Sequence, residues 1–119
     1  NVVIDLILNK IELNEILFHY NQISVSFITY IEVLGYSFKN DQEKSITTQL
    51  MHQLKVIYPN EKITDWVIEY RQIKKIKIPD AIILATARFL EIPLITSDLG
   101  DFSNIDPKVT IIKPERKTI

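Results

Sequence analysis

Residues 79–96 read PDAIILATARFLEIPLIT, and this stretch decides the fold class. Pro79 and Asp80 are residue types that favour the first turn of a helix, and the apolar run Ala81–Leu90 supplies its body. Pro93–Thr96 is short and apolar, as strands of a parallel sheet are when both faces are buried. A helix followed within a few residues by such a strand predicts an α/β fold with a parallel sheet.

The same alternation of helix and short strand extends to both sides of this stretch. Three further runs are short, apolar and rich in β-branched residues, which predicts strands. They are Ile23–Phe27, Leu54–Tyr58 and Val109–Ile112. Helical spacing of apolar residues predicts the intervening helices. These are Glu12–Tyr20 after an apolar opening at Asn1–Leu8, Thr29–Phe38, Asp41–Gln53 and a helix running to Ile73.

Local patterns predict how these helices begin and which face each buries. Thr29, with Glu32 three residues later, fits a capping box at the start of the second helix. Thr64 is the expected cap of the helix that runs to Ile73. The expected inward residues are Ile46, Leu50 and Leu54 for one helix, and Ile63, Val67, Tyr70 and Ile73 for the next.

The composition indicates one ordinary globular domain over residues 1–119, with a central parallel sheet flanked by helices on both sides. The chain is 46% hydrophobic and 24% charged, which excludes disordered and collagen-like classes. It has no Cys and two His, so disulfide scaffolds, thiolate metal sites and multi-His sites are excluded. We expect a cytoplasmic protein without a membrane span, and the net charge of −1 predicts no bulk attraction to nucleic acid.

Four acids follow predicted strands or begin the next helix. They are Glu32, Asp80, Asp98 and Asp101. Because ligands of open α/β sheets gather at the carboxyl ends of the strands, these side chains are expected at one edge. A group of carboxylates repels itself and requires a cation, and hard oxygen ligands favour Mg²⁺ or Mn²⁺. Hydrolysis of a phosphodiester is the reaction that such a site predicts most directly.

Each acid also has a purely structural interpretation. Glu32 fits the capping box with Thr29, and Asp80 fits a helix start favoured by the helix dipole. Asp98 and Asp101 flank Leu99-Gly100, where a turn favours Asp and Gly for backbone reasons. Their joint placement at one edge favours the functional interpretation.

Four segments resemble, in order, the motifs of the PIN domain family and its VapC-type toxins. Asn1–Asp5, NVVID, is similar to the end of the opening motif Asp-Thr-Asn-Val-Leu-Ile-Asp. Ile23–Gly35, ISVSFITYIEVLG, resembles the segment that carries the acidic Glu of the family. Ile78–Ala87, IPDAIILATA, resembles the helix that opens with the third acid. Leu94–Phe102, LITSDLGDF, resembles the closing Thr-x-Asp/Asn-x-x-Asp-Phe segment.

The resemblance implies a metal-dependent ribonuclease that forms homodimers and is blocked by a VapB-like antitoxin. It implies Glu32, Asp80, Asp98 and Asp101 as ligands of Mg²⁺ or Mn²⁺, with Thr96 and Asn1 orienting them. The first Asp of the family motif would lie two residues before Asn1. We therefore expect the start of the first strand to be missing, which predicts weak metal binding and an inactive chain.

Other polar and aromatic residues have two interpretations each. The cluster Arg71, Lys74, Lys75 and Lys77 fits contacts with RNA phosphates, or a solvated helix end. His19 and His52 fit an acid–base pair less well than structural roles, because they are expected away from the strand edge. Trp66 and Tyr70 fit base stacking less well than core packing.

Two rival functions remain beside the ribonuclease. One is a PIN-like module without activity that acts through dimer or antitoxin contacts. The other is a phosphohydrolase with a covalent Asp, which needs a nucleophilic Asp at the end of the first strand. The sequence offers none there, so this hypothesis ranks last.

Overall fold

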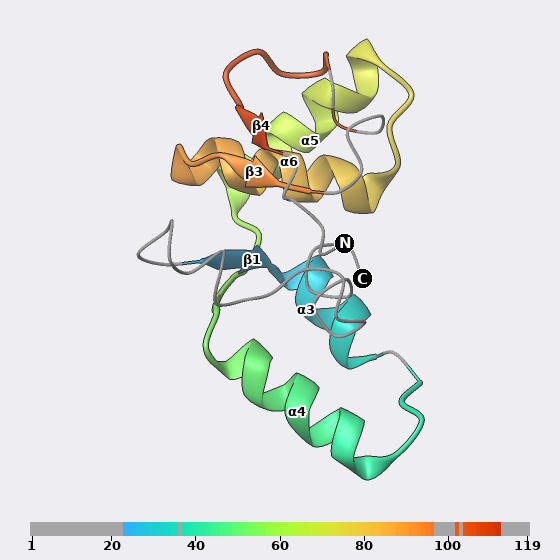
Figure 1. The fold of residues 1–119 in the computed structure, drawn as a ribbon. Helices are drawn as coiled ribbons and strands as arrows, with labels where there is room; N and C mark the ends of the chain where they lie inside the picture. Colours follow the sequence, from blue (N-terminus) through green and yellow to red (C-terminus); the bar gives the residue numbers. More distant parts are fainter. Residues whose placement is uncertain (1–22, 36, 97–101, 103, 113–119) are drawn as a thin grey trace.

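The computed structural model describes residues 23–35, 37–96, 102 and 104–112. Helices and short strands alternate through this part of the chain (Figure 1). The elements in order are β1 (Ser24–Ser26), α3 (Phe27–Leu34), α4 (Asp41–His52), β2 (Lys55–Ile57), α5 (Glu61–Ile73), α6 (Ile78–Leu90), β3 (Leu94–Ile95) and β4 (Ile111–Ile112). The α/β fold predicted from the sequence is confirmed.

The described strands form two parallel pairs. Ser24 lies opposite Lys55 in the β1–β2 pair, and Leu94 lies opposite Ile111 in the β3–β4 pair. The strands predicted before α3, before α5 and at both ends of residues 94–112 are therefore present, each shorter at its ends than predicted. The elements expected over Asn1–Leu8 and Glu12–Tyr20 lie outside the described residues.

Helix α3 begins two residues earlier than the predicted capping box. Ser26 is its N-cap, and its hydroxyl oxygen accepts a hydrogen bond from the Ile28 N–H at 3.2 Å. Thr29 is then a buried residue inside the first turn, and Glu32 is an exposed residue of the second turn. The capping-box interpretation of Glu32 is wrong, because the helix already has a cap in the last residue of β1.

Helix α4 begins at the predicted residue, Asp41, and ends at His52, one residue before the predicted end, but it buries a different face. Ile46 is 52% exposed, whereas Thr47 and Met51 are almost fully buried. The Thr47 hydroxyl donates to the Glu43 carbonyl at 2.8 Å, so the threonine enters the interior without an unsatisfied donor. Packing against α3 thus selects a face one residue away from the predicted one.

Helix α5 is capped by Asn60 and not by Thr64. The Asn60 side chain accepts from the Ile63 N–H at 2.9 Å, while the Thr64 hydroxyl donates to the Asn60 carbonyl within the first turn. Ile63 and Tyr70 are buried as predicted, but Ile73 is 68% exposed at the end of the helix.

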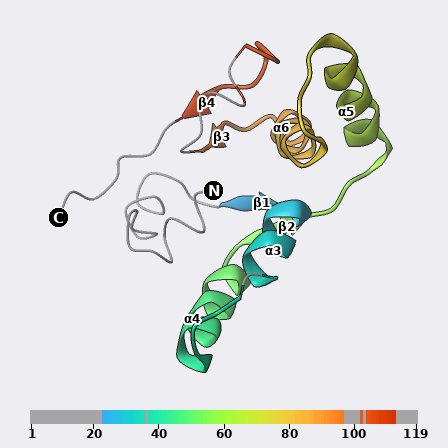
Figure 2. The ribbon, with the colours of Figure 1, turned by 90° about the vertical axis from the view of Figure 1, so that its right-hand side faces the viewer.

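Helix α6 occupies the centre of the described structure. It packs against α5, β1 and α3, and Figure 2 shows it nearly along its axis with α5 beside it. Ala81, Leu84 and Ala85 are fully buried, and the small alanine side chains allow the neighbouring elements to approach closely. The larger apolar cluster joins α5, α6 and residues 102–111, and a smaller one joins β1, α3, α4 and Leu54.

No helix within the described ranges is both long enough and apolar enough to cross a membrane.

Candidate active site

Asp80 lies in the first turn of α6, where the sequence analysis placed it. The preceding Lys77 is the N-cap but provides no side-chain hydrogen bond, and Pro79 occupies the first turn. The amide groups of this turn and the helix dipole favour negative charge, so the half-buried Asp80 carboxylate is in a favourable field. The local fold therefore supports an ionised carboxylate at this point.

Glu32 comes from a second element that contacts α6. It lies in the second turn of α3 with its side chain exposed to solvent, and α3 packs against α6. In Figure 1, α3 leaves β1 on the same side of the molecule as the start of α6. The structure thus carries two of the four predicted acids on neighbouring helices.

The remaining acids of the predicted set, Asp98 and Asp101, lie outside the described residues, as does Asn1. Within residues 23–35, 37–96, 102 and 104–112, no three His, Cys, Asp or Glu side chains gather closely enough to hold a metal ion. The two predicted ligands that the structure describes both offer carboxylate oxygens. His52 does not add a nitrogen donor to them, because it is exposed at the far end of α4. Such oxygen donors suit Mg²⁺ or Mn²⁺ more than Zn²⁺.

Thr96 lies directly after β3 and is 6% exposed. Its N–H donates to the Ile112 carbonyl at 3.0 Å, which extends the β3–β4 pairing by one bond. This backbone bond fixes the point at which the chain leaves β3 toward Asp98.

The four basic residues of the predicted cluster are all exposed, at the end of α5 and in the connection to α6. They are Arg71, Lys74, Lys75 and Lys77. The Arg71 guanidinium donates to the Ile76 carbonyl at 2.6 Å and holds the turn between the helices. Lys77 is three residues before Asp80, so the connection brings positive charge directly to the start of α6.

Of the aromatic pair on α5, Tyr70 belongs to the interior, as the preferred interpretation held, whereas Trp66 is only partly buried. Tyr70 is 2% exposed, and its hydroxyl donates to the Asp106 carboxylate at 2.5 Å. Trp66 packs against the larger apolar cluster, and its ring is covered by the Arg88 guanidinium at 4.2 Å from the centroid. His19, the other half of the acid–base alternative, lies outside the described residues.

Sequence reasoning missed a buried polar network around Asp106. Its carboxylate accepts from the Tyr70 hydroxyl and the Lys108 N–H, and it lies 3.3 Å from the Arg88 guanidinium. Burial, reinforced by the hydrogen bond to Asp106, raises the pKa of the Tyr70 hydroxyl above its ordinary range. The only sequence signal is Asp-Pro in a turn, which says nothing of a partner 36 residues away.

Comparison with known proteins relates most of the chain to one family. The sequence model of the PIN domain matches residues 1–108. Comparison with curated protein sequences gives no match.

Three solved structures show the same fold over nearly the whole chain. A toxin–antitoxin complex from Klebsiella pneumoniae is 33% identical, with a TM-score of 0.77 over 92% of this chain and 91% of the other. VapBC-1 from nontypeable Haemophilus influenzae is 24% identical, with a TM-score of 0.75 over 95% and 92%. DNA-bound VapBC from Salmonella typhimurium is 19% identical, with a TM-score of 0.78 over 92% and 90%.

Proposed function

Since the chain belongs to the PIN domain family, we propose that it is the ribonuclease toxin of a VapBC-type toxin–antitoxin pair and depends on Mg²⁺ or Mn²⁺. The family match carries this proposal. PIN domains are generally nucleases, and they generally use divalent metal ions. The placement of Asp80 and Glu32 on contacting helices supports it, because carboxylates from separate elements are what such chemistry needs.

We assign four carboxylates to the metal: Glu32, Asp80, Asp98 and Asp101. The helix dipole at the start of α6 favours negative charge at Asp80, and the exposed Glu32 is accessible to a hydrated ion. A divalent ion held there supplies an activated water and charge stabilisation for phosphodiester cleavage. Thr96 and Asn1 are proposed to orient these carboxylates by hydrogen bonding.

The basic cluster is proposed to bind the RNA backbone. Lys74, Lys75 and Lys77 are exposed and lie on the connection that ends at Asp80. Phosphates bound there would place the strand next to the carboxylates, which compensates for the near-neutral charge of the whole chain. Arg71 has fewer N–H donors left for a phosphate, because one of them already holds the Ile76 carbonyl.

The proposed partners are a VapB-like antitoxin and a second copy of the chain, both acting in the cytoplasm. The similar structures from Haemophilus influenzae and Salmonella typhimurium are VapBC complexes, which supports an antitoxin here. Ile31 is 57% exposed next to Glu32 on α3. An antitoxin that covered this apolar residue would also limit access to Glu32.

The test is cleavage of structured RNAs by the product of the complete coding sequence, with Mn²⁺ and with EDTA. Asp80→Asn keeps the size of the side chain and removes its charge, so cleavage should fall by at least about 100-fold, as for loss of one electrostatic catalytic group. Asp65→Asn is the matched control, because Asp65 is an exposed acid of α5. Its activity should equal that of the unchanged protein.

Cleavage that persists in EDTA, or that survives Asp80→Asn, would contradict the proposed metal site. No cleavage of any RNA by the unchanged protein would favour the alternative, a PIN-like module that acts only by binding.

A further inference from the structure

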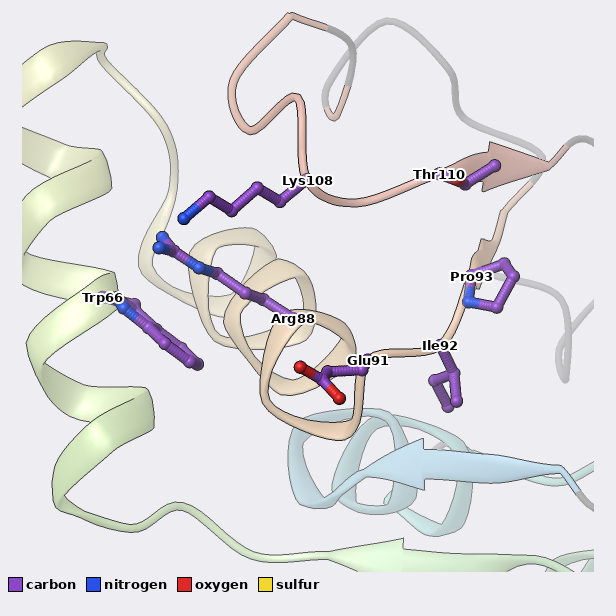
Figure 3. A pocket seen from close by; sticks show the side chains of 7 residues that line it. All are labelled: Trp66, Arg88, Glu91, Ile92, Pro93, Lys108 and Thr110. Carbon is purple, nitrogen blue, oxygen red and sulfur yellow. The ribbon is translucent and has the colours of Figure 1, made fainter.

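A pocket of about 480 Å³ lies at the end of α6 opposite to Asp80. Its walls come from α5, from the end of α6 and from the segments that lead into β3 and β4 (Figure 3). Trp66 and Arg88 form one side, and Lys108 reaches in from the segment before β4. Ile92 and Pro93 provide an apolar wall on the way to β3. None of these residues belongs to the proposed active site.

Cationic groups converge on one side of this pocket. Figure 3 shows the head groups of Arg88 and Lys108 pointing to the same place beside Trp66. The Lys62 ammonium lies 5.4 Å from the centre of the same indole ring. The Arg88 guanidinium is held in position from two directions, by the Trp66 ring at 4.2 Å and by the buried Asp106 carboxylate at 3.3 Å. It is therefore preorganised, with further N–H donors available toward the pocket.

The buried Asp106 carboxylate balances only one of these positive charges, that of Arg88. Asp106 already accepts hydrogen bonds from the Tyr70 hydroxyl and the Lys108 N–H as well as facing Arg88. In the part of the chain that the structure describes, the Lys108 ammonium forms no ion pair of its own. Like charges directed at one place repel each other unless an anion lies between them. An anionic group bound between the Arg88 and Lys108 head groups relieves this repulsion.

The other wall has the opposite character. Glu91 follows the last residue of α6, where the helix dipole is negative, and its carboxylate borders the same pocket. A ligand that fits therefore has a strongly anionic end, an apolar or planar middle to lie against Ile92 and Pro93, and hydroxyl or amino donors for Glu91. The volume is that of a small-molecule site.

We propose that this pocket binds a phosphate monoester of nucleotide size. The phosphate lies against Arg88 and Lys108, and the ribose hydroxyls point toward Glu91. Arginine and lysine in this arrangement suit a phosphate, because the guanidinium forms two parallel hydrogen bonds and the ammonium adds a compact charge. The same group is available from a free nucleoside monophosphate or from the 5′-phosphate of an RNA chain.

The sole tryptophan of the chain makes the test direct. Trp66 lines the pocket, so its fluorescence reports on this site alone. We would titrate the full chain with AMP, adenosine, inorganic phosphate, and a short oligoribonucleotide with and without a 5′-phosphate, all in EDTA to prevent cleavage. Lys108→Gln removes one proposed phosphate contact, and Lys44→Gln on exposed α4 is the matched control.

We expect a saturable fluorescence change with AMP, competition by inorganic phosphate, and none with adenosine. Lys108→Gln should weaken AMP binding about tenfold, as for loss of one charge-assisted hydrogen bond, whereas Lys44→Gln should not change it. Tighter binding of the 5′-phosphorylated oligonucleotide than of AMP would assign the source to RNA, and the reverse to a free nucleotide.

The absence of a saturable change up to several millimolar AMP and oligonucleotide would overturn the proposal. So would equal affinities of Lys108→Gln and the unchanged protein, with far-ultraviolet circular dichroism showing both folded. Asp80→Asn should bind AMP normally, so failure here is distinguishable from failure of the proposed nuclease.

Discussion

Removing the Asp106 carboxylate should be among the most destabilising single changes in the described part of the molecule. Asp106→Ala leaves the Tyr70 hydroxyl, which is on a residue only 2% exposed, without its acceptor. A buried donor without a partner costs about 1–3 kcal/mol. The Arg88 side chain is 17% exposed, so water replaces part of the ion pair and its loss adds less than a fully buried charge would. The Lys108 N–H also loses its acceptor.

Together these losses predict a decrease in the free energy of unfolding of about 3 kcal/mol, which for a chain of this length is a decrease in Tm of about 12 °C. Urea unfolding followed by Trp66 fluorescence measures the change. Tyr70→Phe should cost only about 1–1.5 kcal/mol, because it removes the donor and leaves Asp106 with its other partners. Asp65→Ala, on the exposed side of α5, should stay within about 0.5 kcal/mol of the unchanged protein.

The double variant separates this network from a general packing effect. With Tyr70→Phe already present, Asp106→Ala leaves no hydroxyl unsatisfied, so the two costs should fall short of additivity by about 1–2 kcal/mol. Additive costs, or an Asp106→Ala protein as stable as Asp65→Ala, would refute the assignment of Asp106 as the acceptor that holds residues 104–110 to α5 and α6.

Three further changes test the fold. Asn60→Ala should lower the free energy of unfolding by about 1 kcal/mol, because it removes the cap of α5, whereas Thr64→Ala should lower it by less than half of that. The reverse order would restore Thr64 as the cap. Leu84→Ala should lower the free energy of unfolding by about 3–5 kcal/mol, whereas Ile68→Ala should change it little, because Ile68 is 52% exposed. Equal effects of the two variants in thermal unfolding would contradict the position of the core. Stability should fall as pH rises above the ordinary tyrosine pKa of 10.0, because the pKa of Tyr70 is higher in the folded state than in the unfolded state, and the slope from this group is at most about 1.4 kcal/mol per pH unit. Subtracting the unfolding curve of Tyr70→Phe isolates that slope, and identical pH dependences of the two proteins would contradict it.

The elements of the fold could be predicted from sequence where pattern and packing agree. The run Ala81–Leu90 is so apolar that a buried central helix is expected whichever of its faces packs against the neighbours. Pro93 separates this helix from β3. The predictions failed where two neighbouring residues satisfied the same rule. Ser26 and Thr29 are both suitable caps, and only the end of β1 decides for Ser26.

The buried face of α4 failed for a related reason. Ile46 is the more apolar choice, but the register of α4 against α3 places Thr47 inside, and its hydroxyl bonds to its own helix. The spacing of apolar residues predicts that a segment is helical more reliably than it predicts which residues face the core. Moving the buried face by one residue changes its apolar content only slightly.

The positions of Asp80 and Glu32 on their helices could be predicted from chain order alone. Asp80 follows the connection into α6 and Glu32 lies in the helix that follows β1, so nothing about their partners was needed to place them on these elements. For Asp106, chain order gives no such prediction. Its role arises from Tyr70 and Arg88, which reach it from two different helices, and pairings across the chain are invisible to local pattern.

Helix α6 links these observations, because each of its ends carries a different chemistry. Its first turn holds Asp80, and its last turn holds Arg88 against Trp66 and Asp106. Between them, buried small residues such as Ala85 seat the helix against α5, β1 and α3. The distance between Asp80 and the α3 carboxylate is therefore set by core packing and not by the acids themselves, which would repel each other. Packing in the middle of the helix thus fixes how the start of α6 lies relative to α3, whether or not an ion is bound.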